Sequence, residues 1–473
     1  MQSKIEDAYY NAILTRDAKF DGKFFSAVKT TGIYCRPICP AKPKRVNVEF
    51  FSSALLAEKA GYRPCLRCRP ESAPDSPRWH GKNSVVSRAV QVLFNDESAI
   101  ELNEKEFAAR FEMSARHLRR LFLDELGRTP MQIKRNHRLN LARKLIIETH
   151  LAFIDIAFSV GFDSVRRFND AIRERFSKTP TELRRRIKQK PYSDLIEFNV
   201  CYRPPLDWQA SLDYYQKHKI GDLEEFKDGC YQRIFRFENE TGIVRVHNNE
   251  KKHRLDISLQ TSNVNALNYV LCRIKEMFDL SLDPVYITSA FESQPGLHRF
   301  YESRHGVRLA RCWDRFELAI STILGQLISV KHATQLTNEL MELYGEQHEH
   351  PITSKQIRFF PCPEKLASEN LAALKVTRAK KMAIITLAQH VFRGEIHFSS
   401  YQDPKKFKHN LLKIHGIGPW TAEYIALRAI GDTDAFPEGD VYLDKILGTT
   451  NIDKLTPWRG YLATILYKYG GKT

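Results

Sequence analysis

Four cysteines near the N-terminus have the residue type and the spacing of a metal site. They form two close pairs, Cys35 with Cys39 and Cys65 with Cys68, and 25 residues separate the pairs. Two such pairs can converge on one tetrahedral Zn²⁺, which holds sulfur as thiolate at neutral pH. The spacing alone favours a purely structural zinc site, and the alternative is a site whose thiolate reacts.

A second group of residues lies in LLKIHGIGPWTAEYIALRAIGDTDAFPEGD (411–440). Gly416 and Gly418 permit a tight hairpin between two helical patterns, and its backbone N–H groups could bind a phosphate. Trp420 and Tyr424 follow one helical turn apart, and Asp440 comes 22 residues after Gly418. A carboxylate beside aromatic faces could stabilise a cationic reaction centre. The alternatives are core packing for the two rings and helix capping for Asp440.

The charge of the chain indicates a polyanionic partner. The 473 residues carry a formal charge of +17. Residues 1–190 contain 37 Lys and Arg against 22 Asp and Glu, whereas the remainder contains 36 against 34. The basic excess therefore belongs to the N-terminal two-fifths, as expected of a region that binds nucleic acid. The chain has no long apolar run, so we expect a cytoplasmic protein without membrane association.

Four regions with different secondary-structure patterns must position these residues. Short strands and turns are expected in residues 1–72, amphipathic helices in 84–188, strands alternating with a helix in 192–300, and helices from 301 onward. The segments 71–83 and 184–191 have the composition of linkers. At roughly 100–200 residues per domain, the length predicts about three or four domains.

An internal repeat occupies the second region. FAARFEMSARHLRRLFLDELGRTP (107–130) and IAFSVGFDSVRRFNDAIRERFSKTP (156–180) share a layout in which Ser114 and Ser164 lie 50 residues apart. Each copy has the content of a helix-turn-helix unit, whose second helix enters the major groove of DNA. The candidate base readers or phosphate contacts on these second helices are Arg116, Arg119, Arg120, Arg166, Arg167 and Asn169. The segment resembles the AraC family of DNA-binding domains.

The first region resembles the N-terminal domain of the Ada family of methylphosphotriester-repair proteins. The match is carried by TTGIYCRPICPAK (30–42) and AGYRPCLRCRPE (60–71), with both cysteine pairs and their flanking Arg-Pro. The resemblance implies that Cys35 is both a zinc ligand and the nucleophile that takes a methyl group from a DNA phosphotriester. Arg36, Arg63, Arg67 and Arg69 are candidate phosphate contacts near this site.

The C-terminal half, from about residue 195, resembles the AlkA family of 3-methyladenine DNA glycosylases, which contain a helix-hairpin-helix. Besides 411–440, the match includes CYRPPLDWQASLDYY (201–215) and RLARCWDRFELAISTILGQLISVKHA (308–333). The resemblance implies that Asp440 is the catalytic carboxylate and that Trp420 and Tyr424 line the pocket for the flipped base.

Further family roles concern the pocket and the opened duplex. By resemblance, Tyr214 and Trp458 are aromatic residues near the flipped base. Leu327 is the side chain inserted into the duplex where the base leaves, with Gln326 beside it. Relatives that also cut the strand have a Lys just after the hairpin, where this chain has Trp420, so we expect base excision alone.

One departure from the family leaves a second interpretation open. The segment between Asp440 and Trp458 is shorter than is usual in AlkA-like proteins. The alternative to a repair enzyme is therefore a damage-sensing transcription factor with an inactive glycosylase-like half. In the first interpretation the protein excises alkylated purines, accepts methyl on Cys35 and activates transcription. We expect a monomer whose partners are damaged and promoter DNA, and RNA polymerase.

These observations predict a multidomain fold. The expected parts are a small α+β zinc domain (1–75), an all-α double helix-turn-helix domain (84–190), an α+β AlkA N-terminal domain (195–300) and an all-α helix-hairpin-helix glycosylase domain (301–473).

Overall fold

The structure is a computed structural model that describes residues 2–65, 67–68, 70, 84–95, 102–184, 195–353, 355–399 and 402–470. The chain forms two compact units. Unit 1 contains Met1–Pro204, Asn248–Lys275 and Leu280–Asp283, and unit 2 contains Pro205–His247, Glu276–Asp279 and Pro284–Thr473. The predicted linker 71–83, and all of 184–191 except its first residue, lie outside the described residues.

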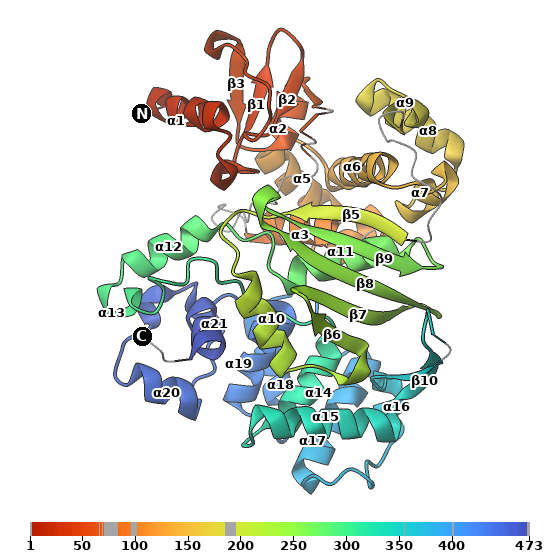
Figure 1. The fold of residues 1–473 in the computed structure, drawn as a ribbon, viewed down its shortest axis with the longest axis vertical. Coiled ribbons are helices and arrows are strands. Elements are labelled where there is room, and N and C mark those ends of the chain that lie inside the picture. The colour runs from red at the N-terminus through yellow and green to blue at the C-terminus, as the bar shows by residue number, and fades with distance from the viewer. Residues whose placement is uncertain are drawn as a thin grey trace. The chain divides into compact units, whose positions relative to one another are not determined.

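Near its N-terminus, unit 1 contains a small sheet that follows helix α1 (Figure 1). Its strands follow the order β3-β1-β2-β4, in which β1 is antiparallel to β2 and β3 whereas β2 and β4 are parallel. Cys35 ends β2 and Cys65 directly follows β4. The parallel pairing therefore brings the two cysteine pairs to the same edge. The elements are α1 (Gln2–Thr15), β1 (Phe25–Val28), β2 (Ile33–Cys35), β3 (Val48–Phe51), α2 (Ala54–Lys59) and β4 (Arg63–Pro64).

Helices alone form the next part of unit 1. Ser114 and Ser164 cap α5 and α8, because their hydroxyls accept hydrogen bonds from the backbone N–H of His117 and Arg167. The predicted repeat is thus visible as two helix pairs, α4–α5 and α7–α8, with α6 between them. The helices are α3 (Ser84–Asn95), α4 (Glu104–Ala109), α5 (Ala115–Leu126), α6 (Pro130–Glu148), α7 (Phe153–Ser159), α8 (Val165–Phe176) and α9 (Pro180–Arg184).

Two longer strands and a helix complete unit 1. Strand β5 (Leu195–Cys201) pairs antiparallel with β9 (Arg254–Thr261), in a register that places Leu195 opposite Gln260. Alternate residues of β9 are buried, as the period of a half-buried strand requires. Helix α11 (Ala266–Met277) follows β9.

Unit 2 combines a strand meander with a helical bundle. The meander is antiparallel, β6 (Glu224–Lys227) with β7 (Cys230–Phe237) and β7 with β8 (Glu240–Asn249). A short hairpin joins β10 (Glu346–Glu349) to β11 (Gln356–Phe359). Buried Arg233 of β7 forms ion pairs with Glu224 and Glu317, and so ties the meander to the bundle.

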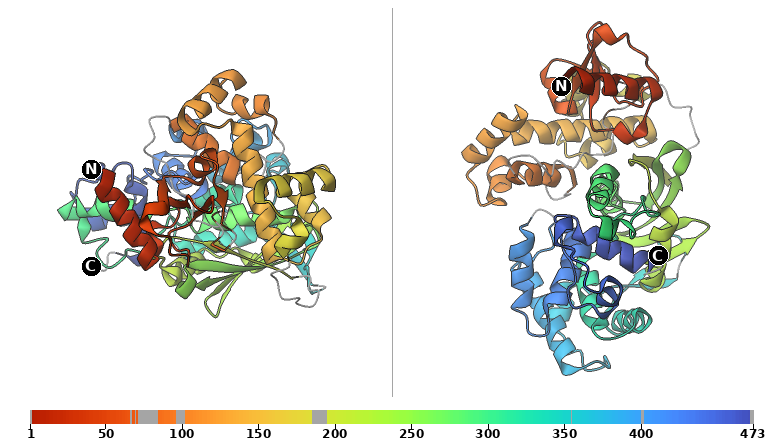
Figure 2. Two further views of the ribbon diagram at one scale, coloured as in Figure 1. Left: turned by 90° about the horizontal axis from the view of Figure 1, so that it is seen from above. Right: turned by 90° about the vertical axis from the view of Figure 1, so that its left-hand side faces the viewer.

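The bundle gathers the cyan-to-blue helices into one body (Figures 1 and 2). Its buried residues are mainly aliphatic. Among the described residues, no helix has the length and apolar composition that a bilayer span requires. The helices of unit 2 are α10 (Trp208–Lys217), α12 (Pro284–Glu292), α13 (Pro295–His298), α14 (Arg315–Gly325), α15 (Val330–Tyr344), α16 (Pro363–Ser368), α17 (Arg378–Phe392), α18 (Pro404–Leu412), α19 (Pro419–Ile425), α20 (Val441–Leu447) and α21 (Arg459–Tyr469).

Candidate functional sites

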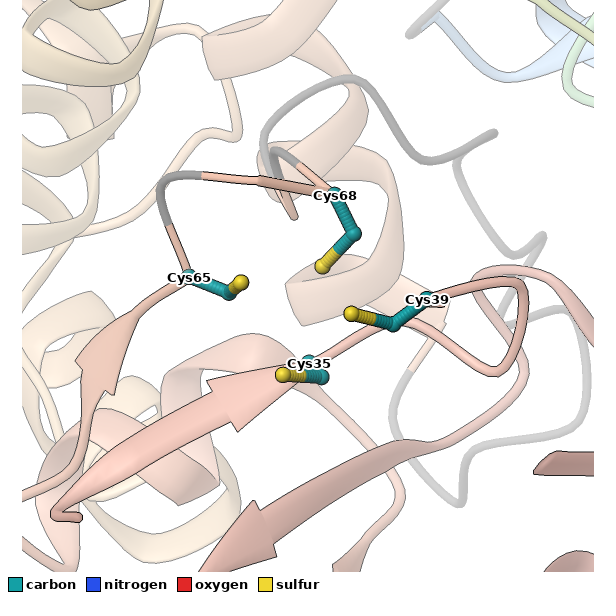
Figure 3. A group of neighbouring side chains, drawn as sticks. All are labelled: Cys35, Cys39, Cys65 and Cys68. Atoms are coloured by element: carbon teal, nitrogen blue, oxygen red, sulfur yellow. The ribbon is translucent and has the colours of Figure 1, made fainter. Parts of the chain in front are cut away.

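The four predicted cysteines converge on one point. Their sulfur atoms all lie within 4.8 Å of one another, and all four side chains are buried. Figure 3 shows the four sulfurs directed towards a common centre. Four thiolates in this arrangement are the donor set of a tetrahedral zinc site, so the residues fit the predicted metal.

Backbone N–H groups support two of these sulfurs. The N–H of Arg36 donates to the sulfur of Cys68 at 3.3 Å, and the N–H of Arg67 donates to the sulfur of Cys65 at 3.3 Å. Such contacts stabilise negative charge on the sulfurs and fix the loops that carry them.

Arg36 does not have the exposed position that a phosphate contact requires. Its side chain is buried, and its Nε donates to Oδ1 of Asp21 at 2.8 Å while Nη1 donates to the carbonyl of Cys68 at 3.2 Å. The expectation that Arg36 contacts DNA was therefore wrong, because its buried guanidinium binds Asp21 and the Cys68 carbonyl. Arg63 and Arg67 are exposed, and Arg69 lies outside the described residues.

The predicted arginines of the helix-turn-helix pair lie on exposed faces. Arg119 pairs with Glu104, and Arg167 pairs with Asp163 at 2.7 Å. Ion pairs on an exposed surface are weak and screened by salt, so these carboxylates do not prevent the two arginines from contacting a DNA phosphate. Arg116, Arg120 and Arg166 are also exposed, whereas Asn169 is half-buried.

In unit 2, the Asp440 carboxylate accepts hydrogen bonds on both of its oxygens. Oδ1 accepts from the backbone N–H groups of Tyr442 and Leu443, at 2.9 and 3.1 Å, and caps α20. Oδ2 accepts from the indole N–H of Trp420 at 2.8 Å and from the hydroxyl of Tyr467 at 2.7 Å. Capping, which the sequence offered as an alternative, and contact with an aromatic group therefore occur together.

The two aromatic residues that contact this carboxylate both pack against a third, Tyr424. Trp420 stacks on Tyr424 with 5.4 Å between ring centroids, and Tyr467 meets Tyr424 edge-on at 5.7 Å. Burial, with Tyr424 and Asp440 nearby, raises the pKa of Tyr467, so its hydroxyl keeps the proton that it donates. The sequence reasoning missed Tyr467, because α21 also carries Tyr461 and Tyr469 and spacing does not separate the three.

A buried cation contacts two of the tyrosines. Arg428, on the π-helical turn Ala426–Ile430 that continues α19, donates to the hydroxyls of Tyr214 at 2.5 Å and Tyr424 at 2.8 Å. The two hydroxyls are 3.2 Å apart. The structure thus brings Tyr214 together with Tyr424, and Arg428 fixes the positions of both hydroxyls.

The neighbours of Trp458 differ from those of Trp420 and Tyr424. Its ring is buried and stacks on Tyr286 at 6.2 Å, and it meets Tyr461 at 6.0 Å. These contacts attach the start of α21 to α12. The ring that contacts the Asp440 carboxylate from α21 is that of Tyr467.

Leu327, the side chain expected to enter the duplex as a wedge, lies on the turn between α14 and α15. This turn, residues 325–328, is called the wedge turn below. Its side chain is fully exposed, at 104% of the reference accessibility, and its φ is +60°. The neighbouring Gln326 donates from Nε2 to the carbonyl of Gly416 at 2.8 Å and to the hydroxyl of Thr421 at 2.9 Å. The wedge turn is therefore attached to the glycine hairpin, in which Gly416 has a φ of +92°.

Family models match three parts of the chain. Residues 8–71 match the metal binding domain of Ada, residues 107–186 a helix-turn-helix domain, and residues 197–314 the AlkA N-terminal domain. These matches confirm the predicted zinc site of the Ada type and the multidomain fold class.

Curated relatives and solved structures agree with these domains. A probable bifunctional transcriptional activator/DNA repair enzyme AlkA of Mycobacterium tuberculosis is 33% identical, and the match covers 97% of this chain and 95% of that protein. DNA-3-methyladenine glycosylase 2 of Escherichia coli is 29% identical over 58% of this chain and 98% of its own length. The structure of 3-methyladenine DNA-glycosylase from Archaeoglobus fulgidus superposes with a TM-score of 0.50 at 15% identity, over 58% of this chain and 98% of that one.

The fold and the two sites define a class of multidomain proteins that join an Ada-type zinc domain and a helix-turn-helix region to a glycosylase fold. Within this class, the chain belongs to the family of the bifunctional transcriptional activator/DNA repair enzymes of AlkA type.

Proposed function

We propose that this protein excises alkylated purines of the 3-methyladenine type as a monofunctional DNA glycosylase. We propose further that Cys35 accepts methyl from DNA phosphotriesters and that this event activates transcription. The observation that carries the first proposal is the carboxylate of Asp440, held by Trp420 and Tyr467 beside the Tyr424 ring.

This geometry supports base excision. Enzymes that act on a base flip it out of the duplex, and in this proposal the exposed Leu327 fills the space that the base leaves. Electron-rich rings attract a cationic alkylated base, which is a good leaving group. As the bond between C1′ and the base nitrogen breaks, the base keeps the electron pair and the sugar becomes cationic. The Asp440 carboxylate stabilises that cation, water adds to C1′, and the proton of the water is released.

A test of excision uses Asp440→Asn, because Asn caps helices as well as Asp does and so preserves α20. We expect wild-type protein to release methylated purines from methylated DNA and the variant to release at least about 100-fold less at equal DNA affinity. Asp444→Asn, an exposed carboxylate on the same helix, is the matched control. Bases would be separated and counted by chromatography.

One feature of the chain favours a second function, that of a damage sensor. Only the seven-residue α20 and a short 3-10 turn lie between Asp440 and Trp458. If wild-type protein bound methylated DNA but released no base, the sensor would replace the enzyme as the function of unit 2.

Methyl transfer at Cys35 has a clear charge consequence. Zinc bound by the four cysteines would keep their sulfurs as thiolates. The Cys35 sulfur forms a bond to the methyl carbon, the bond from that carbon to the phosphotriester oxygen breaks, and the phosphodiester leaves as an anion. The sulfur becomes a neutral thioether, so the site loses one negative charge and repels DNA phosphate less.

Mass spectrometry tests this step. After incubation with DNA that contains methylphosphotriesters, we expect one added methyl on the peptide containing Cys35. Peptides containing Cys201 or Cys312 provide internal controls. An unmodified Cys35 peptide would leave the cluster as a structural zinc site.

Promoter recognition is proposed for α5 and α8. The exposed positions of Arg116, Arg120 and Arg166 support this proposal. They lie near the starts of helices that Ser114 and Ser164 cap, where recognition helices carry their base contacts. Activation would also require contact with RNA polymerase, and the proposed active form is a monomer in the cytoplasm.

A further inference from the structure

The turn that carries Leu327 has a strained backbone. Gln326 has φ −55° and ψ 128°, Leu327 has φ +60°, and the N–H of Ile328 donates to the carbonyl of Gly325 at 3.4 Å. These are the features of a type II turn with Leu327 at its third position. That position normally takes Gly or Asn, because a Cβ is disfavoured at positive φ. Leucine gains no compensating burial, since its side chain is fully exposed.

A relaxed alternative exists for such a turn. Types I and II differ by a flip of the central peptide, here the Gln326–Leu327 peptide, and type I places its third residue at negative φ. The flip would reverse the carbonyl of Gln326 and bring the φ of Leu327 to a negative value. Contacts from residues outside the turn must therefore stabilise the type II conformation, in which Leu327 has a positive φ.

Lys380, at the start of α17, makes that contact. Its Nζ donates to the carbonyl of Gln326 at 2.9 Å and to the carbonyl of Leu324 at 2.7 Å. The first carbonyl belongs to the peptide whose flip would relax the turn, and the second belongs to the last turn of α14. The ammonium group thus holds one orientation of the peptide with two charge-assisted hydrogen bonds.

Gln326 secures the same turn from its other side. Its side chain is bonded to Gly416 and Thr421, so the residue before Leu327 cannot rotate freely. With both the side chain and the carbonyl of Gln326 held, the strained φ of Leu327 is the conformation that remains.

We propose that Lys380 is a positioning residue that locks the Gln326–Leu327 peptide in the type II orientation and thereby holds the turn that carries the Leu327 wedge in one conformation. This inference rests on the proposed base-flipping function. It assigns to Lys380 a part in opening the duplex and none in breaking the glycosidic bond.

The first experiment compares Lys380→Met with Lys381→Met. Lys381 is the matched control, because its Nζ donates to the carbonyl of Ala372, away from the wedge turn. On methylated duplex DNA we expect Lys380→Met to slow single-turnover excision about tenfold, which corresponds to about 1.4 kcal/mol. On methylated single strands, where no base pair must open, both variants should match wild type within about twofold. Equal losses of Lys380→Met on duplex and single strand would overturn the proposal.

A second readout does not depend on bond breaking. A duplex containing 2-aminopurine becomes more fluorescent when that base is unstacked, and saturating wild-type protein should raise its fluorescence. Lys380→Met should give a much smaller rise, and Lys380→Arg, which keeps the charge, should retain most of it. A wild-type rise without base release would refute the proposed excision but support the lock. Absence of any wild-type rise, or equal rises for Lys380→Met and wild type, would refute the lock.

A double-mutant cycle separates the lock from general stability. If Lys380 acts through the wedge, adding Lys380→Met to Leu327→Ala should cause no further loss of duplex excision. Additive losses would show that Lys380 acts elsewhere and would overturn the proposal.

Discussion

At the scale of single residues, Asp440 uses its two carboxylate oxygens differently. Oδ1 satisfies the first N–H groups of α20, whereas Oδ2 accepts hydrogen bonds from Trp420 and Tyr467. The helix cap orients the side chain through Oδ1 alone, so Oδ2 can accept hydrogen bonds from the aromatic groups. A carboxylate with four donors is held in one orientation before any substrate binds, which is the condition for electrostatic preorganisation.

Tyr467→Phe tests that orientation. The change removes the 2.7 Å hydrogen bond to Asp440 and leaves the ring in place. Hydrogen bonds to charged groups contribute about 1.5–3 kcal/mol, so we expect single-turnover excision to fall tenfold or more. Tyr469→Phe is the matched control, because that hydroxyl, on the same helix, bonds Asp207. Equal rates for the two variants would contradict the role of Tyr467.

His218, whose ring packs against Tyr214, makes the stability of the fold depend on pH. Burial, helped by Arg428, lowers the pKa of His218 to about 4, and its Nδ1 lies 2.8 Å from the carbonyl of Tyr214. The unfolded chain binds this proton near pH 6.5 and the folded chain only near pH 4. Stability is therefore lost as the pH falls from about 6.5 to 4, by at most about 3 kcal/mol.

The His218→Asn variant keeps a side-chain N–H that can donate to the carbonyl of Tyr214, and its amide does not titrate. Denaturant unfolding of wild type and variant at pH 7, 5.5 and 4 should show wild type losing more stability across this range. Parallel pH profiles for the two proteins would show that His218 does not carry the effect.

At the scale of elements, capping and glycine geometry decide where helices begin and how they turn. Ser114 and Ser164 start the second helix of each repeat, and Gly416 allows the hairpin before α19. These signals are local, so they are visible in the sequence. The attachment of the wedge turn to that hairpin through Gln326 is not local, since it joins residues 90 positions apart.

Gly416→Ala is expected to weaken DNA binding by unit 2. Its φ is +92°, and an added Cβ would lie 3.1 Å from the Cβ of Ala383, so the hairpin would be strained by about 1–2 kcal/mol. We expect roughly tenfold lower affinity for duplex DNA in fluorescence anisotropy. Gly394→Ala matches the backbone strain, with a φ of +72°, outside the hairpin. If Gly394→Ala lost as much affinity, the effect would be one of general stability.

At the scale of the whole molecule, the two candidate chemistries lie in different units. All four cysteines belong to unit 1, whereas Asp440 and its three aromatic neighbours belong to unit 2. Almost all of the basic excess belongs to residues 1–190, which lie wholly in unit 1. Promoter binding and methyl acceptance are thus proposed for a basic region, and excision for a region of nearly balanced charge.

Zinc removal should therefore separate the functions. Structural zinc sites supply folding free energy, so a chelator should lower the thermal midpoint of unit 1 and abolish methyl acceptance at Cys35. Base excision by unit 2 should change less than twofold. Restoration by added Zn²⁺ is the control, and a parallel loss of excision on chelation would contradict the separation.

The sequence predicted those features that are encoded by residues close together in the chain, and it did not predict contacts between distant residues. The cysteine spacing predicted a site whose sulfurs do meet, and the family comparisons confirm its zinc and the multidomain fold. The residue roles at Asp440, Leu327 and the recognition helices stay predictions, although the structure brings Asp440, Trp420 and Tyr424 together. Arg36 was misjudged, because nothing near it in the chain reveals its distant partner Asp21.

By itself, therefore, the sequence determined what local order can encode: the metal-binding spacing, the repeated helix-turn-helix, the glycine hairpin and the distribution of charge. Only the tertiary structure decided that Tyr467 contacts Asp440, that Arg428 binds Tyr214 and Tyr424, and that Lys380 holds the strained turn at Leu327. Each of these contacts depends on where separate elements come to lie when the core packs. No spacing along the chain records that arrangement.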